Sequence, residues 1–246
     1  MMKEDLTVIK QKIKEAKAIV YFGGAGTSTE SNIPDFRTES GLYNQPAFAG
    51  RDPQVLLSTR TLYQEPEVFY AYYRSHRLFP DAKPNKAHQV LARWEKEGKL
   101  KAVITQNIDG LHQMAGSQKV LELHGSVHRN YCTECQREAT LEEIADPGRQ
   151  VPVCRQCGGM LRPDVVFFGE PLDQQVLHQA VEALKMADFL IVGGTSLVVY
   201  PAAGLIDYFS GKNMLLINRD ATPFDQRATW VIHQSIGEFL WQLAEE

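Results

Sequence analysis

A short apolar run that ends in a glycine loop constrains the fold most. Residues 18–22 are apolar, and Gly23 and Gly24 follow them directly. Such a run, bounded by glycine, is typical of a strand buried on both faces of a parallel sheet. The segment Gly24-Ala25-Gly26 allows a tight turn whose N–H groups can bind a phosphate. Because Thr29 stands where the dinucleotide fingerprint has a third small residue, this loop alone fits a nucleotide site or a plain strand-to-helix turn.

The residues after the loop favour the nucleotide site. Ser28, Thr29 and Ser31 supply hydroxyl groups. Residues 34–37 then place a proline, a carboxylate, an aromatic ring and a guanidinium side by side. A plain turn requires none of this chemistry, so we expect a ligand here.

The remaining chain alternates between apolar runs and helical patterns. This alternation predicts an α/β fold with a doubly wound parallel sheet. A capping box, Ser235 with Glu238, predicts the start of the last helix. The other expected helices cover residues 3–16, 85–98 and 173–186 and a segment after Pro201, and the further strands cover 100–105, 120–123, 165–168, 189–192, 214–217 and 229–232.

Polar residues follow several of these strands. Ligands of open α/β sheets bind beyond the carboxyl ends of the strands, so these residues are site candidates. Asn107, Asp109, Thr195 and Ser196 also fit ordinary helix caps. His124 ends one strand, where a neutral imidazole could act as a general base, although a lone histidine is more often structural.

Two cysteine pairs, Cys132 with Cys135 and Cys154 with Cys157, have the spacing of a four-thiolate zinc site. Four protein ligands leave no open position on zinc, so the sequence predicts a structural metal and disfavours a zinc hydrolase. A redox dithiol would need only one pair. The chain has 246 residues, a net charge of −4 and no run of lysine and arginine. We therefore expect no specific nucleic-acid partner, no membrane segment and a cytoplasmic location.

Taken together, these motifs resemble the sirtuin family of NAD-dependent protein deacylases, and specifically its zinc-containing, deacetylase-type bacterial members. The resemblance runs from about residue 16 to 240, in the order of the family. Thr27 stands where the family usually has an apolar residue, and Asn32 where it usually has glycine. The matching segments are residues 24–37, 105–109, 123–125, 167–170 and 194–197 and the two cysteine pairs.

The resemblance implies a Rossmann-type NAD-binding domain with two insertions. The domain would comprise residues 1–37, 85–127 and 169–246. A helical insertion, 38–84, would include a mobile cofactor loop at 38–52, and a zinc-binding insertion would cover 128–168. NAD and an acetyl-lysine protein or peptide would enter the cleft between the large domain and the insertions.

The resemblance also implies the reaction and the roles of residues. His124 and Asn107 would be catalytic, with His124 as general base on a ribose hydroxyl. The products would be free lysine, nicotinamide and O-acetyl-ADP-ribose. Removal of other acyl groups and ADP-ribosyl transfer are the alternatives. NAD would contact Gly24, Ala25, Gly26, Thr29, Asp35, Phe36, Arg37, Gln106, Ile108, Asp109, His124, Gly194, Thr195, Ser196, Asn218 and Asp220; the substrate, added as a strand, would contact Val165, Val166, Phe168, Gly169, Glu170, Val198 and Val199.

The sequence of the helical insertion indicates which acyl groups the protein would remove. Family members that remove acidic acyl groups carry Tyr-x-x-Arg there, whereas residues 69–74 of this chain never place a tyrosine three positions before an arginine. We therefore expect short neutral acyl groups to be preferred over succinyl.

Overall fold

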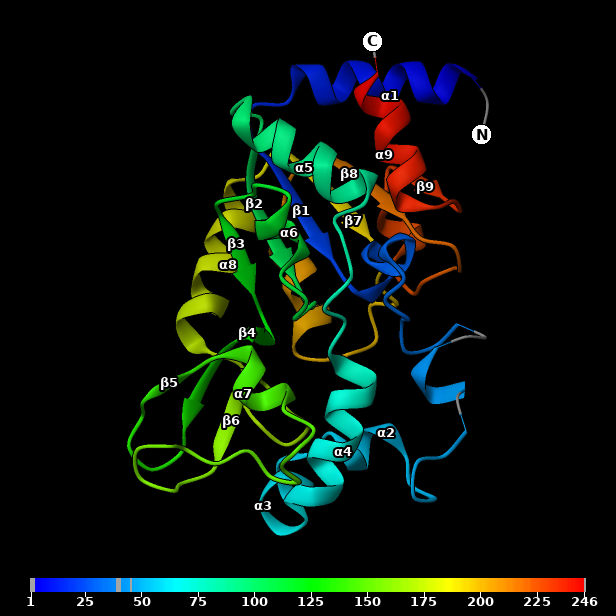
Figure 1. Ribbon diagram of the computed structural model, residues 1–246. Helices are drawn as coiled ribbons and strands as arrows, with labels where there is room; N and C mark the ends of the chain where they lie inside the picture. Colours follow the sequence, from blue (N-terminus) through cyan, green and yellow to red (C-terminus); the bar gives the residue numbers. More distant parts are fainter. Residues whose placement is uncertain (1–2, 39–40, 45, 246) are drawn as a thin grey trace.

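The larger lobe is built on one six-stranded parallel sheet (Figure 1). The computed structural model describes residues 3–38, 41–44 and 46–245. Neighbouring strands of this sheet all pair in parallel, which confirms the predicted fold class. In spatial order the strands are β3 (Val120–Glu122), β2 (Leu100–Thr105), β1 (Ile19–Gly23), β7 (Phe189–Gly193), β8 (Asn213–Ile217) and β9 (Trp230–Ile232).

The order of these strands determines where a ligand can bind. From β1 the chain moves outward to β2 and β3, then returns to the other side of β1 and continues through β7, β8 and β9. The direction of winding therefore reverses between β1 and β7. Their last residues, Gly23 and Gly193, are register partners, and Gly23 also pairs with Thr105 of β2. A crevice at such a reversal is where doubly wound sheets bind nucleotides.

Side chains of each strand alternate between two buried faces, as the period of a strand requires. In β1, Ile19 and Tyr21 pack on one face, and Val20 and Phe22 on the other. The face with Ile19 and Tyr21 is covered by α1 (Lys3–Glu15), α5 (Lys86–Lys96) and α9 (Ile236–Ala244). The face with Val20 and Phe22 is covered by α8 (Gln174–Met186) and the 3₁₀ helix η4 (Ala202–Tyr208).

Among the described residues, no helix is long and apolar enough to cross a bilayer.

Two predictions about helix ends have different outcomes. Asn85 caps α5 as expected, since its side chain accepts a hydrogen bond from the Ala87 N–H. The capping box at Ser235 is wrong, because the Ser235 side chain makes no capping hydrogen bond. Glu238 instead pairs with Lys86, and the carboxylate of Glu30 accepts from the Gly237 N–H at 2.9 Å. A long-range contact therefore replaces the local cap.

The smaller lobe combines a three-stranded antiparallel sheet with short helices (Figure 1). The predicted strand at residues 165–168 is wrong, because β6 ends at Val165 and belongs to this second sheet. The apolar residues that follow it line the cleft between the lobes instead. The elements are β4 (Gly125–Cys132), β5 (Glu138–Ala139), β6 (Leu161–Val165) and α7 (Leu141–Ala145), with α2 (Pro53–Leu56), α3 (Thr59–Gln64) and α4 (Pro66–Arg77) from the helical segment.

The predicted cofactor loop, residues 38–52, is described in part. Residues 39, 40 and 45 lie outside the described residues. The described part contains one 3₁₀ turn, η3 (Leu42–Asn44).

Tyr21 of β1 is fully buried, and its hydroxyl lies 2.7 Å from the Thr27 Oγ1. We expect Thr27→Val to lower the free energy of unfolding by about 1–3 kcal/mol, because it leaves the Tyr21 hydroxyl buried without a partner. Urea unfolding measures this loss. Tyr21→Phe combined with Thr27→Val should recover part of it, since both polar groups are then absent. A double variant less stable than Thr27→Val alone would contradict this account.

Candidate active site

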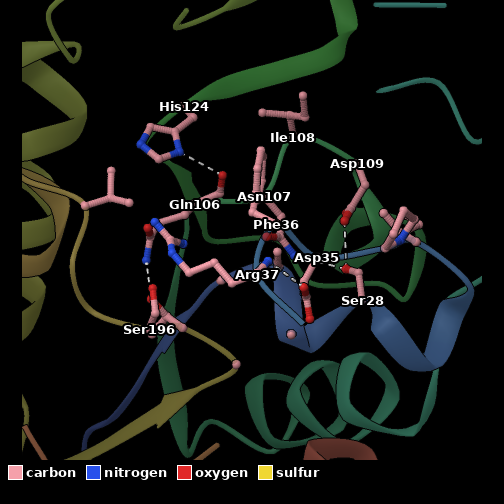
Figure 2. A pocket seen from close by; sticks show the side chains of 18 of the residues that line it. Ser28, Asp35, Phe36, Arg37, Gln106, Asn107, Ile108, Asp109, His124 and Ser196 are labelled. Atoms are coloured by element: carbon pink, nitrogen blue, oxygen red, sulfur yellow. Dashed lines mark hydrogen bonds between the residues drawn. The ribbon is translucent and has the colours of Figure 1, made fainter. Parts of the chain in front are cut away.

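A single cavity of about 370 Å³ opens at the carboxyl ends of the parallel strands and extends toward the smaller lobe. Its lining contains every residue that the sequence predicted for NAD and every predicted substrate residue except Val198. The side chain of Val198 is 48% exposed and lies outside the lining. The topology thus brings together residues from distant parts of the chain, as Figure 2 shows for Ser28, Phe36, Asn107 and His124.

The glycines of the loop after β1 allow it to pass very close to the loop after β7. The Gly26 N–H donates to the Gly194 carbonyl at 2.8 Å, and a Cβ on Gly26 would lie 2.6 Å from the Gly194 Cα. The N–H groups of Gly24, Gly26, Thr27 and Ser28 all donate to backbone carbonyls. The expectation that several N–H groups are free for phosphate is therefore wrong. Within residues 24–28, the Ala25 N–H alone has no such partner among the described residues.

Asp35 organises the loop that follows. Its Oδ1 accepts hydrogen bonds from the Arg37 N–H at 2.9 Å and from the N–H and hydroxyl of Thr38. The ring of Phe36 lies between Tyr43, with ring centroids 5.7 Å apart, and the guanidinium of Arg77, 4.9 Å from the Phe36 centroid. These contacts hold the aromatic ring at the cavity wall (Figure 2).

Asn107 and Asp109 are joined through Ser28. The Asn107 amide donates to the Ser28 Oγ at 3.0 Å, and the Ser28 hydroxyl donates to Asp109 Oδ2 at 2.7 Å (Figure 2). The other carboxylate oxygen of Asp109 accepts from the Leu111 N–H, at the start of α6 (Leu111–Met114). Asp109 therefore accepts from the first residue of α6 and also lines the cavity, although the N-cap of this helix is Gly110.

Thr195 likewise has two partners. Its Oγ1 accepts from the Leu197 N–H and from the side-chain amide of Gln106 at 3.0 Å. This second bond connects the ends of β2 and β7 across the end of β1. The side chain of Asn218, after β8, donates to the Asp220 carbonyl, and both residues line the cavity.

His124 has the geometry of a general base. Its Nδ1 lies 2.9 Å from the carbonyl of Gln106, so Nδ1 carries the proton and Nε2 keeps its lone pair (Figure 2). Burial lowers the pKa of His124 below 6.5, and the nearby positive charge of Arg77 lowers it further, against the opposing effect of the Gln106 carbonyl. The imidazole is therefore neutral near pH 7 and can accept a proton.

This lowered pKa predicts a pH profile. If His124 is the base, kcat/KM should rise with pH through the folded pKa and be level by neutral pH. Because that pKa is lowered, the midpoint of the acid limb should lie below 6.5. Initial rates in buffers from about pH 5 to 8 would measure it. An acid limb centred above pH 7 would contradict the assignment.

The four cysteines form a separate centre in the smaller lobe. All four are free thiols, and their sulfur atoms lie within 4.8 Å of one another. Four sulfurs at about 2.3 Å from a central ion form a tetrahedral zinc site, which this cluster can accommodate. The Arg137 Nε donates to the Cys154 Sγ, as expected for a sulfur that carries negative charge.

Comparison with known proteins identifies the family. The sequence model of the Sir2 family matches residues 24–201. The chain belongs to the Sir2, or sirtuin, family. An NAD-dependent protein deacetylase of Clostridium acetobutylicum is 51% identical over 240 residues, with 98% of each chain covered.

Solved Sir2 structures have the same fold. A Sir2 variant with deacetylated p53 peptide and 3′-O-acetyl ADP ribose is 40% identical, with a TM-score of 0.89 over 97% of this chain and 96% of that one. A Sir2 protein with p53 peptide and NAD⁺ is 42% identical, with a TM-score of 0.81 over 98% of this chain and 95% of that one.

The structure accounts for both departures from the sirtuin pattern. Asn32 has φ 62°, the left-handed conformation that glycine adopts freely and that asparagine tolerates best among the other residues. Thr27 provides the partner of the buried Tyr21 hydroxyl. Neither change alters the wall of the cavity.

The sequence analysis missed two cavity residues on α4, Tyr73 and Arg77. The spacing of four between Tyr73 and Arg77, which places them on one face of a helix, was the available signal.

Proposed function

We propose that this protein is an NAD-dependent protein-lysine deacetylase. The observation that carries the proposal is the position of His124. His124, whose Nε2 is unprotonated, lines the cavity that the glycine loop after β1 and the apolar residues after β6 also line. A base, a nucleotide site and an apolar acyl site in one cavity fit the sirtuin reaction, and the relative from Clostridium acetobutylicum carries the name of that activity.

The donors along the cavity suit the diphosphate and riboses of NAD. The Ala25 N–H has no partner among the described residues, and Ser196 and Arg37, which carry a hydroxyl and a guanidinium, line the same cavity. Backbone N–H groups and arginine are the donors that bind phosphates in proteins. Bound NAD would supply an activated ribose carbon whose leaving group is nicotinamide. We infer that Ile108 and Asp109, which also line the cavity, contact the nicotinamide.

The substrate lysine would lie along the residues that follow β6. Val165 and Val166 line the cavity and provide an apolar wall for the lysine stem and acetyl group. Phe168 cannot pair with a peptide through its backbone, because its N–H and carbonyl already bond to Leu57 and Thr59. We therefore infer that β-augmentation starts at Gly169.

Glu170 would support this peptide site indirectly. Its carboxylate forms an ion pair with the buried Arg162 at 2.8 Å and accepts from the Phe167 N–H at 2.9 Å. These bonds hold the turn after β6 in place, so we propose a positioning role for Glu170.

In the reaction, His124 would take a proton from a ribose hydroxyl. The carbonyl of Gln106 fixes the imidazole with Nε2 as acceptor. The hydroxyl could then attack the activated acyl carbon. Asn107, held by Ser28, would orient the reacting groups, and Phe36 would exclude water from the ribose carbon.

An acetyl-lysine peptide tests this function. Mass spectrometry should show loss of the acetyl group only when NAD is present, with nicotinamide released. Nicotinamide release without deacetylation would favour ADP-ribosyl transfer or NAD hydrolysis instead. No turnover of the acetyl peptide would refute the proposal. The boundaries of the Rossmann-type domain, the helical insertion and the zinc-binding insertion stay predictions from sequence, and so does the cytoplasmic location.

A further inference from the structure

A bulge in β4 faces the loop that follows β2. Along the β4–β6 pair, Ser126 is the partner of Asp164 and Asn130 is the partner of Pro163, although Asp164 and Pro163 are adjacent in β6. Residues 127–129 therefore lie outside the pairing that the described residues of β4 and β6 form. Bulges are frequent beside active sites, where they redirect a side chain or an N–H group.

Two donors of this bulge reach the backbone of the loop after β2. The Val127 N–H donates to the Ile108 carbonyl at 3.0 Å. The Nε2 of His128 lies 3.0 Å from the Asp109 carbonyl. Because a carbonyl oxygen can only accept, Nε2 carries the proton of this bond. Ile108 and Asp109 line the cavity, whereas the two residues that hold them lie outside its lining.

The bulge is itself held from both lobes. Arg129 pairs with Glu122 of β3 and, at 2.8 Å, with Asp164 of β6. The side-chain amide of the buried Asn130 donates to the Val127 carbonyl at 3.1 Å. The bulge therefore presents its donors to the larger lobe in a fixed arrangement.

The bond from His128 acts at the most adaptable point of the loop. Gly110 follows Asp109 and has φ 74°. Glycine adopts many backbone conformations at little cost, so the peptide group between Asp109 and Gly110 can turn unless another group holds it. His128 holds the carbonyl of that peptide group, and its ring covers the glycine, since a Cβ on Gly110 would lie 2.6 Å from the His128 Cδ2.

The side chain of Asp109 is fixed separately. Its carboxylate accepts from the Ser28 hydroxyl and from the Leu111 N–H, which both belong to the larger lobe. These two bonds leave the orientation of the Asp109 carbonyl to the imidazole of His128.

We propose that His128 is a positioning residue for the nicotinamide of NAD. By holding the Asp109 carbonyl, it sets the orientation of the segment that contains Ile108 and Asp109. His128 acts through this segment, because it lies outside the cavity lining. The proposal rests on the proposed function, in which Ile108 and Asp109 contact the nicotinamide, and adds a residue that supports this contact.

The alternative is that His128 only joins the two lobes. A bond with that role alone would change the stability of the fold and weaken every ligand of the cavity to the same extent. A positioning role instead affects the nicotinamide end of NAD. ADP-ribose separates the two roles, because it shares the rest of the NAD molecule and lacks nicotinamide.

The test measures the Kd of NAD and of ADP-ribose by calorimetry in the wild type and in His128→Phe, which keeps a ring over Gly110 but has no N–H. We expect the ratio of the NAD Kd to the ADP-ribose Kd to rise by about threefold or more, the effect of one lost hydrogen bond. His128→Gln, whose amide can donate to the same carbonyl, should keep the ratio within about twofold of the wild-type value. Nicotinamide is a product and can rebind to its pocket, so the nicotinamide concentration that halves deacetylation should also rise in His128→Phe.

His178→Phe is the matched control, because His178 is exposed on α8 and lies outside the cavity lining. Its ratio should equal that of the wild type. An unchanged ratio in His128→Phe would overturn the inference, and so would an equal loss of affinity for both ligands, which would assign His128 to the fold. A ratio in His128→Gln as high as that in His128→Phe would also contradict a role for the hydrogen bond. Deacetylation is measured separately: its absence in the wild type would refute the proposed function, whereas the ratio decides on His128.

Discussion

Replacement of His124 by alanine is expected to lower kcat for deacetylation by about 10²- to 10⁴-fold, the usual contribution of a general base. The imidazole is neutral, is fixed by the Gln106 carbonyl and has Nε2 available in the cavity. Alanine leaves no group at that position to accept the proton. Initial rates on an acetyl-lysine peptide, at saturating NAD, measure the loss.

His178→Ala is the matched control, since His178 is exposed on α8 and lies outside the cavity lining. It should have the wild-type rate. NAD binding by calorimetry should persist in His124→Ala, which separates loss of the base from loss of the fold. A His124→Ala protein with more than half of the wild-type kcat would show that another group is the base.

Removal of zinc is expected to abolish most of the activity and to unfold the smaller lobe. Cys132 and Cys154 are buried in the hydrophobic core of that lobe, and a structural zinc contributes directly to the free energy of folding. The smaller lobe also supports two parts of the active site. His124 directly precedes β4, and its carbonyl accepts a hydrogen bond from the Val166 N–H, just beyond β6. When the lobe unfolds, both His124 and the apolar wall formed by Val165 and Val166 lose their support.

Elemental analysis should give one zinc per chain in the protein as isolated. Treatment with a chelator should release it, with loss of near-ultraviolet circular dichroism and of deacetylation, and added zinc should restore both. Cys132→Ala should behave like the chelated protein. A zinc-free protein that keeps its full activity would contradict a structural role.

Much of the fold could be predicted because local sequence determines it. The apolar run before Gly23 and those that end at Thr105 and Gly193 form buried parallel strands as expected. Since parallel strands end at one edge of a sheet, the polar residues that follow them had to lie close together. The spacing of the cysteines similarly predicted a cluster whose sulfur atoms the fold brings within 4.8 Å.

Contacts between distant segments could not be predicted in the same way. The Gly26 N–H donates to the Gly194 carbonyl, so most N–H groups of the loop that was expected to bind phosphate already have hydrogen-bond partners. Glu30 caps α9 in place of Ser235, because the tertiary structure brings its carboxylate to the first turn of that helix. Arg77 lies 88 positions before Val165 in the sequence, and the tertiary structure places both in one cavity.

The fate of the acetyl group tests the central claim most directly. After reaction of an acetyl-lysine peptide with NAD, mass spectrometry can determine which product carries the acetyl group. We predict that it is recovered on ADP-ribose, with one nicotinamide released for each lysine freed. Recovery as free acetate, with NAD unchanged, would contradict the account, because the residues of the cavity would then serve an ordinary hydrolysis.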